Sequence, residues 1–323
     1  MPKFKIKHIT RYTYTGLVRD SANQIILFPI NDDFQEVLKH DLRISGDPVV
    51  DIYQDYYGNQ VGSFTHCVPH SELEISSELL VDTHHKILPV DDMFASQQWI
   101  DLQSLQSKIP YVDYLMVEHF EALNELKDVV NKQRIVEETP YQTALRYNKY
   151  VFEDFKYIPG ITTVETSLDE VWKLKAGVCQ DFAHILLVML RLLNIPSRYV
   201  SGYVCPNKNG MRGEGATHAW VETYLPNFGW LGLDPTNNCV ANETHVRLAV
   251  GRNFPDCSPV KGVYKGQARH DLEVSVSVSY ENELVEATEI LDIPIEKAPG
   301  FKVNSFKLYS DLMEQQQQEQ QQQ

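Results

Sequence analysis

The chain has 323 residues, of which 43% are hydrophobic, and 29 basic side chains stand against 44 acidic ones, giving a net charge of −15. At roughly 100–200 residues per domain, this length predicts two domains, or two and a fragment. The acidic balance argues against nucleic acid as the main partner, because phosphate binding needs a clustered cationic face. It also disfavours an anionic membrane surface, and no segment approaches the ~20 apolar residues of a membrane-spanning helix.

The cysteines are five in number, widely spaced and without a Cys-x-x-Cys pair: Cys67, Cys179, Cys205, Cys239 and Cys257. Their odd number and spacing favour neither a disulfide framework nor a zinc knuckle. The first residues, MPKFKIKHITRYTYTG, contain no apolar segment typical of a signal peptide. We therefore expect a cytoplasmic protein in which one thiol is a candidate for reactivity.

The N-terminal region, up to about residue 90, reads as a series of short strands. Segments rich in β-branched and aromatic residues alternate with turn signals such as SGDP and YGN. These segments are FKIKHITRYTY, NQIILFPI, EVLKHDLRI, VVDIYQDYY, VGSFTHCV and ELEISSELLV. Regular short strands without a helical period predict an antiparallel β-sandwich domain over residues 1–90.

A change to helical spacing follows from about residue 92. Two capping boxes, Thr139 to Gln142 and Ser167 to Glu170, predict helix starts, and Gly177 is the expected left-handed stop of the second helix. The segment QDFAHILLVMLRLL (180–193) is apolar nearly all round, which predicts a buried helix.

Strands return after this helix at SRYVSGYV, THAWVETYL, WLGLDPT and DLEVSVSVSY, with a loop-rich stretch expected over 239–270. We assign residues 91–312 to a second domain of mixed helices and strands. Residues 313–323, MEQQQQEQQQQ, are expected to be a disordered Gln-rich tail.

A candidate for nucleophilic chemistry stands at the start of the buried helix. Cys179 lies where free N–H groups and the positive end of the helix dipole stabilise a thiolate. A nucleophilic cysteine also needs a base and a group that orients the base. His218 and Asp234 lie on the two strands of a predicted hairpin around 226–229, near the same end.

The loop length of this hairpin decides whether the two side chains meet. A four-residue loop, with Leu225 opposite Trp230, would place His218 and Asp234 on opposite faces of the sheet. A three- or five-residue loop, or one bulge, places them diagonally on the same face. We predict the second arrangement.

Two consecutive segments resemble the bacterial branch of the transglutaminase-like superfamily: GVCQDFAHILLVMLRLLNIPSRYVSGY and, after it, ATHAWVETYLPNFGWLGLDPTNN. This superfamily is related in fold to the papain-type cysteine proteases. Residues 1–85, including YQDYYGNQVGSF, resemble the β-rich domain that precedes its catalytic core. The resemblance implies a papain-like α+β core with Cys179 as nucleophile, His218 as base and Asp234 as the orienting carboxylate. It implies no metal and no organic cofactor.

The reaction that such a triad performs stays open at this point. Attack of Cys179 on a peptide or protein amide gives a thioester. If water then attacks the thioester, the protein is a protease or amidase; if an amine attacks it, the protein is a transglutaminase. We favour hydrolysis, since bulk water is the default acceptor. A non-catalytic binding or scaffold protein of the same fold is the rival. The oligomeric state, the substrate and the role of the β domain are not fixed by the sequence.

Two supporting roles are also open. The helix residues Asp181 and His184 are three apart and are interpreted as a buried polar pair. The backbone N–H of Cys179 is one natural donor to an oxyanion. For the second donor, Trp172 and Tyr157 are candidates, with a structural role equally open for each.

Overall fold

The computed structural model describes residues 2–205, 210–213 and 216–282. All of these belong to one compact unit. The expected tail at 313–323 and the last part of the expected second domain, 91–312, lie outside the described residues. The domain boundary placed at residue 90 stays a prediction.

Alternating apolar and polar residues fold the N-terminal region into antiparallel strands. Along β1 and β5 roughly every second side chain is buried, so that Phe4 and Ile6 of β1 share a core with Leu73 and Ile75 of β5. The strands of this region are β1 (Lys3–Ile25), β2 (Gln35–Ile44), β3 (Asp51–Gln54), β4 (Gln60–His66) and β5 (His70–Thr83).

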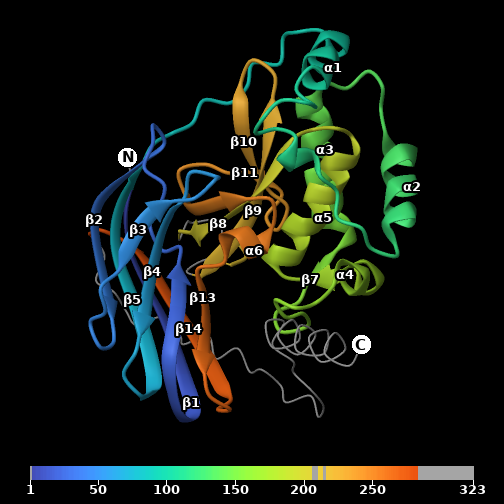
Figure 1. The fold of residues 1–323 in the computed structure, drawn as a ribbon. Helices are drawn as coiled ribbons and strands as arrows, with labels where there is room; N and C mark the ends of the chain where they lie inside the picture. The colour runs from blue at the N-terminus through green and yellow to red at the C-terminus, as the bar shows by residue number, and fades with distance from the viewer. Residues whose placement is uncertain (1, 206–209, 214–215, 283–323) are drawn as a thin grey trace. The chain divides into compact units, whose positions relative to one another are not determined.

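These strands form one curled sheet with two strands from much later in the chain, β13 (Val260–Lys265) and β14 (His270–Tyr280) (Figure 1). The sheet order is β2-β5-β1-β4-β3, and both late strands pair with β1. The first half of β1 pairs with β5 and β14, and its second half pairs with β4 and β13. The predicted antiparallel β architecture is confirmed in this curled form, as is the strand at DLEVSVSVSY.

The remaining described residues build the predicted α+β core. Its helices are α1 (Ala95–Gln103), a 3₁₀ turn η1 (Asp113–Leu115), α2 (Leu123–Gln133), α3 (Pro140–Asp154), α4 (Leu168–Leu174), α5 (Cys179–Leu192) and α6 (Phe254–Cys257). None of the helices in the described ranges has the length and apolarity that crossing a bilayer requires.

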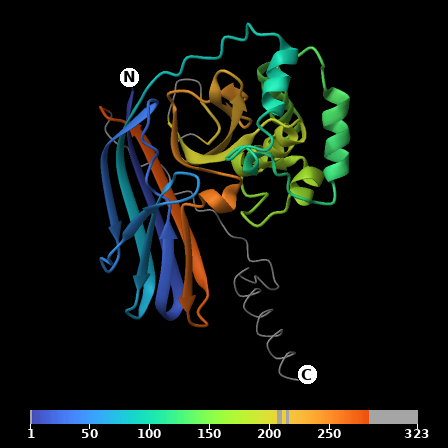
Figure 2. The same cartoon turned by 45° about the horizontal axis from the view of Figure 1, so that its top comes forward.

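A second sheet of five strands, in the order β11-β10-β9-β8-β12, lies beside these helices. Its strands are β8 (Ser197–Val204), β9 (Thr217–Leu225), β10 (Gly229–Asp234), β11 (Cys239–Val240) and β12 (His245–Gly251); β6 (Lys156–Tyr157) and β7 (Ala176–Gly177) pair separately. Helices α1 to α5 gather on one side of this sheet (Figures 1 and 2). The apolar residues of α5 pack there against Ala219, Val221 and Leu231, which explains why α5 has almost no polar face.

Both predicted capping boxes are present, but one helix stop is not where we expected it. Thr139 Oγ1 accepts from the Gln142 N–H at 3.2 Å, and the same contact recurs at the start of α4. Lys175, with φ 48°, is the left-handed residue that ends α4. The prediction that Gly177 ends α4 was therefore wrong. A non-glycine residue rarely adopts a positive φ, and the sequence around Lys175 does not indicate that this residue would do so.

The prediction of a loop-rich stretch over 239–270 was also wrong. This stretch contains β11, β12, α6 and β13. The segment HVRLAVG of β12 is buried at nearly every position, so it lacks the alternation that marks a half-exposed strand.

Two buried amides of the N-terminal region complete the outer edge of β12. The Gln35 side chain donates to Arg247 O at 2.9 Å and accepts from Arg247 N–H at 2.8 Å. The Asn59 side chain makes the same pair of bonds with Val250, both at 2.8 Å. Backbone groups that an edge strand would leave unpaired are satisfied in this way.

Candidate functional site

Cys179 is the first residue of α5, and its side chain is partly exposed. The free N–H groups and the positive dipole end of the helix point toward this position and stabilise a thiolate. Most of the following side chains, from Phe182 to Leu190, are buried against the sheet and the other helices. Packing of the helix therefore fixes the place of the thiol.

Asp181 closes the turn that precedes the nucleophile. Its Oδ2 accepts from the Val178 N–H at 2.8 Å and from the Thr162 hydroxyl at 2.6 Å. Gly177 makes this possible, since a Cβ at that position would overlap the Asp181 carboxylate. This close approach of the Asp181 carboxylate explains why residue 177, which we had expected to end α4, is a glycine.

Gly177→Ala is expected to lower the free energy of unfolding by about 1–3 kcal/mol, the usual cost of overpacking. It should also slow modification of Cys179, because Asp181 must move away from the turn. Thermal unfolding and thiol alkylation measure the two effects. Gly16→Ala is the control, since a Cβ there meets no atom within 4 Å. Equal melting temperatures for the two variants would contradict the prediction.

Asp181 and His184 do not form the pair that we had expected; each side chain bonds to a different partner. His184 Nε2 accepts from the backbone N–H of Phe254 at 3.2 Å, whereas Asp181 binds the turn before α5. Burial lowers the pKa of His184 to about 4, so it is a neutral acceptor there.

The hairpin of β9 and β10 has the register that we predicted. Leu225 pairs with Gly229 across the three-residue loop 226–228. With this loop His218 and Asp234 lie diagonally on one face of the sheet. His218 Nε2–H donates to Asp234 Oδ2 at 2.9 Å, and both side chains are buried.

Asp234 accepts five hydrogen bonds and is fully buried. Its Oδ1 accepts from the backbone N–H groups of Thr236 at 2.9 Å and Asn237 at 3.2 Å. Its Oδ2 accepts from His218, from the Asn237 amide at 2.7 Å and from His245 Nε2 at 3.3 Å. Burial raises the pKa of Asp234, but the two histidines outweigh burial and hold the pKa well below its usual range.

The His218 ring interacts both with this carboxylate and with Cys179. Burial lowers the pKa of His218, but the negative charges of Asp234 and Cys179 and the hydrogen bond to Asp234 raise it to about 10. The ring is therefore an imidazolium at neutral pH. Because Nε2 is bonded to Asp234, Nδ1 is the nitrogen left to face Cys179, and it makes no hydrogen bond in the described part of the chain. All three predicted site residues come together.

Three neighbours of the triad were missed by the sequence reasoning. Asn237, which follows Asp234 in the string DPTNN, could have been found as a carboxylate partner from its position in the turn. A Cβ at Gly213 would lie 2.8 Å from His218 Nδ1, so only glycine leaves this nitrogen clear. Neither Gly213 nor His245 carries a local sequence signal.

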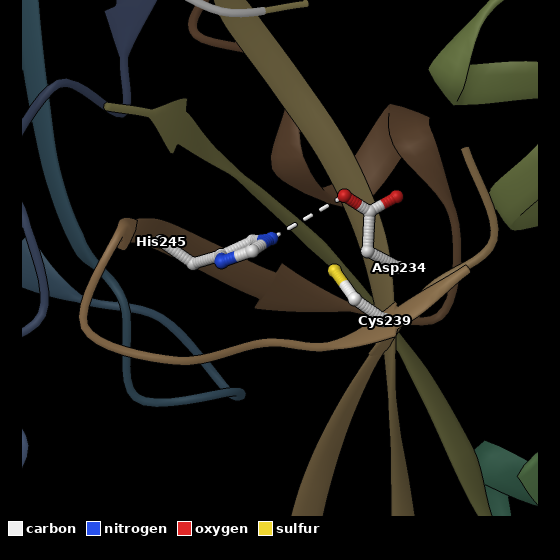
Figure 3. A group of neighbouring side chains, drawn as sticks. All are labelled: Asp234, Cys239 and His245. Carbon is white, nitrogen blue, oxygen red and sulfur yellow. Dashed lines mark hydrogen bonds and ion pairs between the residues drawn. The ribbon is translucent and has the colours of Figure 1, made fainter. Parts of the chain in front are cut away.

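Asp234, Cys239 and His245 place a carboxylate, a thiol and an imidazole within 4.8 Å of one another, as a metal site would (Figure 3). Hydrogen bonds already occupy both Asp234 oxygens, and burial raises the pKa of the Cys239 thiol to about 12, away from the thiolate that binds metals. We interpret the group as a hydrogen-bond network around the carboxylate.

The two candidates for the second oxyanion donor differ in their surroundings. The Trp172 indole N–H donates to Glu125 Oε2 at 3.1 Å and is occupied. Burial and the charges of Cys179 and Asp234 raise the pKa of Tyr157 to about 12. The Tyr157 hydroxyl therefore keeps its proton beside the nucleophile, as a donor must.

Comparison with family models gives two matches along the chain. Residues 127–235 match the transglutaminase-like superfamily, and residues 4–82 match the bacterial transglutaminase-like N-terminal region. The first match includes all three residues of the triad.

Individual proteins extend this likeness over most of the chain. An uncharacterised protein of Mycobacterium leprae is 32% identical over 285 residues, which are 86% of this chain and 99% of that protein. A protein-glutamine gamma-glutamyltransferase of Pseudomonas aeruginosa is 32% identical over 100 residues, 29% of this chain and 15% of the other. The crystal structure of a candidate cysteine protease from Cytophaga hutchinsonii has the same fold, with a TM-score of 0.70 at 21% identity over 88% of this chain and 92% of that one.

Proposed function

Since the chain belongs to the transglutaminase-like superfamily and carries its bacterial N-terminal region, we propose that it hydrolyses amide or peptide bonds through a thioester on Cys179. The observation that carries the proposal is the position of His218, bonded to Asp234 at 2.9 Å and interacting with Cys179. A partly exposed thiol beside an imidazolium at a helix N-terminus meets the requirements of a cysteine nucleophile.

The reaction begins when the Cys179 thiolate attacks the carbonyl carbon and forms a C–S bond. The Cys179 N–H and the Tyr157 hydroxyl stabilise the oxyanion. His218 then gives its proton to the amine nitrogen as the C–N bond breaks, which leaves a thioester and a neutral imidazole. This imidazole takes a proton from water as the water oxygen attacks the thioester carbon, and the C–S bond then breaks. The carboxylic acid product leaves, and the thiolate and imidazolium are restored. Asp234 orients His218 throughout.

An acyltransferase is the second candidate, in which an amine replaces the water. The local similarity to the gamma-glutamyltransferase of Pseudomonas aeruginosa favours it, although that similarity spans only 29% of this chain. Hydrolysis stays our first choice because water reaches a partly exposed thiol without a dedicated acceptor site. The substrate we propose is a peptide or protein amide. The cytoplasmic location stays a prediction that rests on five unpaired cysteines.

Alkylation by iodoacetamide between pH 6 and pH 8 tests the proposed nucleophile without a substrate. Below its pKa an ordinary thiol reacts about tenfold faster for each pH unit. Cys179 should instead react at a nearly constant rate, because His218, with its pKa raised to about 10, stays an imidazolium over this range.

Cys67 is the internal reference, since it is the one exposed thiol among the five. Exposure alone predicts that Cys67 reacts first, whereas the proposed thiolate predicts that Cys179 reacts first at pH 6. Peptide mapping by mass spectrometry distinguishes the two sites. Faster labelling of Cys67 at pH 6 would favour the non-catalytic rival.

The acceptor is identified by incubation with a peptide library that contains primary amines, followed by mass spectrometry. Cleavage of a peptide, or a gain of about one mass unit by deamidation, identifies water as the acceptor. An amine adduct identifies an acyltransferase and would overturn hydrolysis as the main reaction. Products must disappear when Cys179 has been alkylated beforehand.

A further inference from the structure

A second histidine reaches the triad carboxylate from another strand. His245 is the first residue of β12, at the edge of the five-stranded sheet, and its Nε2 lies 3.3 Å from Asp234 Oδ2. Its side chain is buried, with 5% of the residue exposed. No step of the reaction described above uses it.

The hydrogen bond at the other ring nitrogen, Nδ1, fixes which tautomer His245 adopts. Nδ1 accepts the backbone N–H of Asn242 at 3.3 Å. A nitrogen that accepts a hydrogen bond carries no proton, so the proton of neutral His245 lies on Nε2, the atom that faces Asp234. His245 thus presents an N–H donor to the Asp234 carboxylate.

Ring packing gives His245 a second contact with the site. The Trp220 indole meets the His245 ring edge to face, with centroids 5.2 Å apart, and stacks on the His218 ring at 6.2 Å. Gly202 pairs with His218 on the neighbouring strand, and a Cβ there would lie 2.6 Å from the indole. The Trp220 indole therefore contacts both histidines.

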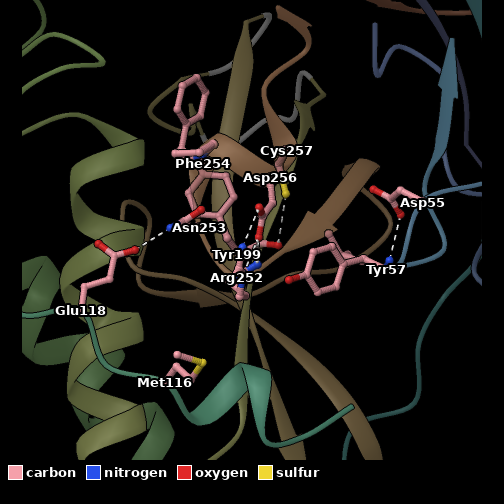
Figure 4. A network of polar contacts seen from close by, with 12 residues as sticks. Asp55, Tyr57, Met116, Glu118, Tyr199, Arg252, Asn253, Phe254, Asp256 and Cys257 are labelled. Atoms are coloured by element: carbon pink, nitrogen blue, oxygen red, sulfur yellow. Dashed lines mark hydrogen bonds and ion pairs between the residues drawn. The ribbon is translucent and has the colours of Figure 1, made fainter. Parts of the chain in front are cut away.

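The far end of β12 is anchored as well (Figure 4). Arg252 donates through its backbone N–H and its Nε to Asp256 Oδ2, both at 3.0 Å, and Asn253 donates to Glu118. Together with the side-chain amides along its outer edge, these bonds hold the strand over its whole length. The fold itself therefore sets where His245 meets Asp234.

We propose that His245 is a positioning residue of this site. It fixes the Asp234 carboxylate so that Oδ2 accepts from His218 Nε2 and the opposite nitrogen of His218 is directed at Cys179. The inference rests on the proposed function of the triad. It predicts a loss in the rate of the chemical step, with substrate binding unchanged.

Two variants of the full chain separate the hydrogen bond from the packing. His245→Phe keeps a ring against Trp220 but removes the N–H donor, whereas His245→Gln keeps a donor and removes the ring. We expect His245→Phe to lower kcat about 10–100-fold, the scale of one lost hydrogen bond to a charged group, without changing KM. His245→Gln should keep kcat within about threefold of the parent, on the same scale of one hydrogen bond retained.

Alkylation of Cys179 at pH 6 is the second readout and needs no substrate. It should slow in His245→Phe and recover in His245→Gln, with both variants folded in a thermal melt. Parent-like kcat and alkylation in His245→Phe would overturn the positioning role and leave the proposed function intact. Equal losses in both variants would overturn it too, since packing would then explain them. Absence of selective Cys179 labelling in the parent chain would instead contradict the proposed function itself.

Discussion

Replacing Cys179 with alanine is expected to abolish turnover of any amide substrate while leaving the fold in place. Without the sulfur no thioester forms, and the loss should be at least about 10⁴-fold, as for removal of a nucleophile from other triads. The substitution removes one atom from a partly exposed position at the start of α5, where the buried residues that follow carry the packing. Steady-state rates and thermal unfolding measure the two parts of the prediction.

Cys67→Ala provides the matched control, because it removes an exposed thiol. Its rate and melting temperature should equal those of the parent. Turnover that persists in Cys179→Ala would show that another group is the nucleophile. A collapse of the melting temperature in Cys179→Ala would show instead that this thiol is a packing residue.

The positions of Cys179, His218 and Asp234 could be predicted because each follows from a local pattern. The apolar run after Cys179 marks a buried helix, and its first residue lies at the positive end of the dipole. The alternation of THAWVETYL and WLGLDPT sets which side chains share a face once the loop length is fixed. The prediction was a three- or five-residue loop or one bulge, and the register of β9 and β10 shows the three-residue loop.

The supporting residues could not be predicted because their partners are remote in sequence. His245 lies on a strand with no alternation, and its contact with Asp234 depends on β8 separating β9 from β12. The same holds for Gln35 and Asn59, whose amides bind β12 from the N-terminal region. Nothing in the polar segments around these two amides identifies a strand more than 150 residues away as their partner.

These remote contacts give the N-terminal region a physical connection to the site. Gln35 and Asn59 supply the backbone partners that the edge strand β12 would otherwise lack. Since β12 begins with His245, the N-terminal region helps to place a donor to Asp234. The late strands β13 and β14, which pair with β1, join the two regions further.

The roles of the base and the carboxylate should separate when His218→Ala is compared with Asp234→Asn. His218→Ala removes the proton donor and acceptor of every chemical step and should cost about 10⁴-fold or more in rate. Asp234→Asn leaves His218 able to exchange protons but poorly oriented, so its loss of rate should be smaller, about 10²–10⁴-fold.

Both substitutions should also lower stability. The five hydrogen bonds to Asp234 all come from donors, two at Oδ1 and three at Oδ2. An asparagine places its own NH₂ group against at least two of these donors, whichever way the amide turns. Each unpaired buried group costs about 1–3 kcal/mol, so Asp234→Asn should lose at least about 2 kcal/mol of unfolding free energy.

His218→Ala takes away one donor and the positive charge that faces Asp234, so a buried carboxylate loses its counter-ion. Breaking such a buried pair costs about 3–5 kcal/mol, so His218→Ala should lose at least as much stability as Asp234→Asn. Rates measured at equal folded fractions, together with urea unfolding of both variants, separate the loss of rate from the loss of stability. The assigned roles predict that Asp234→Asn keeps more activity than His218→Ala at equal folded fractions. If Asp234→Asn were the less active variant, Asp234 would take a direct part in the proton transfers, and the orienting role would have to be abandoned.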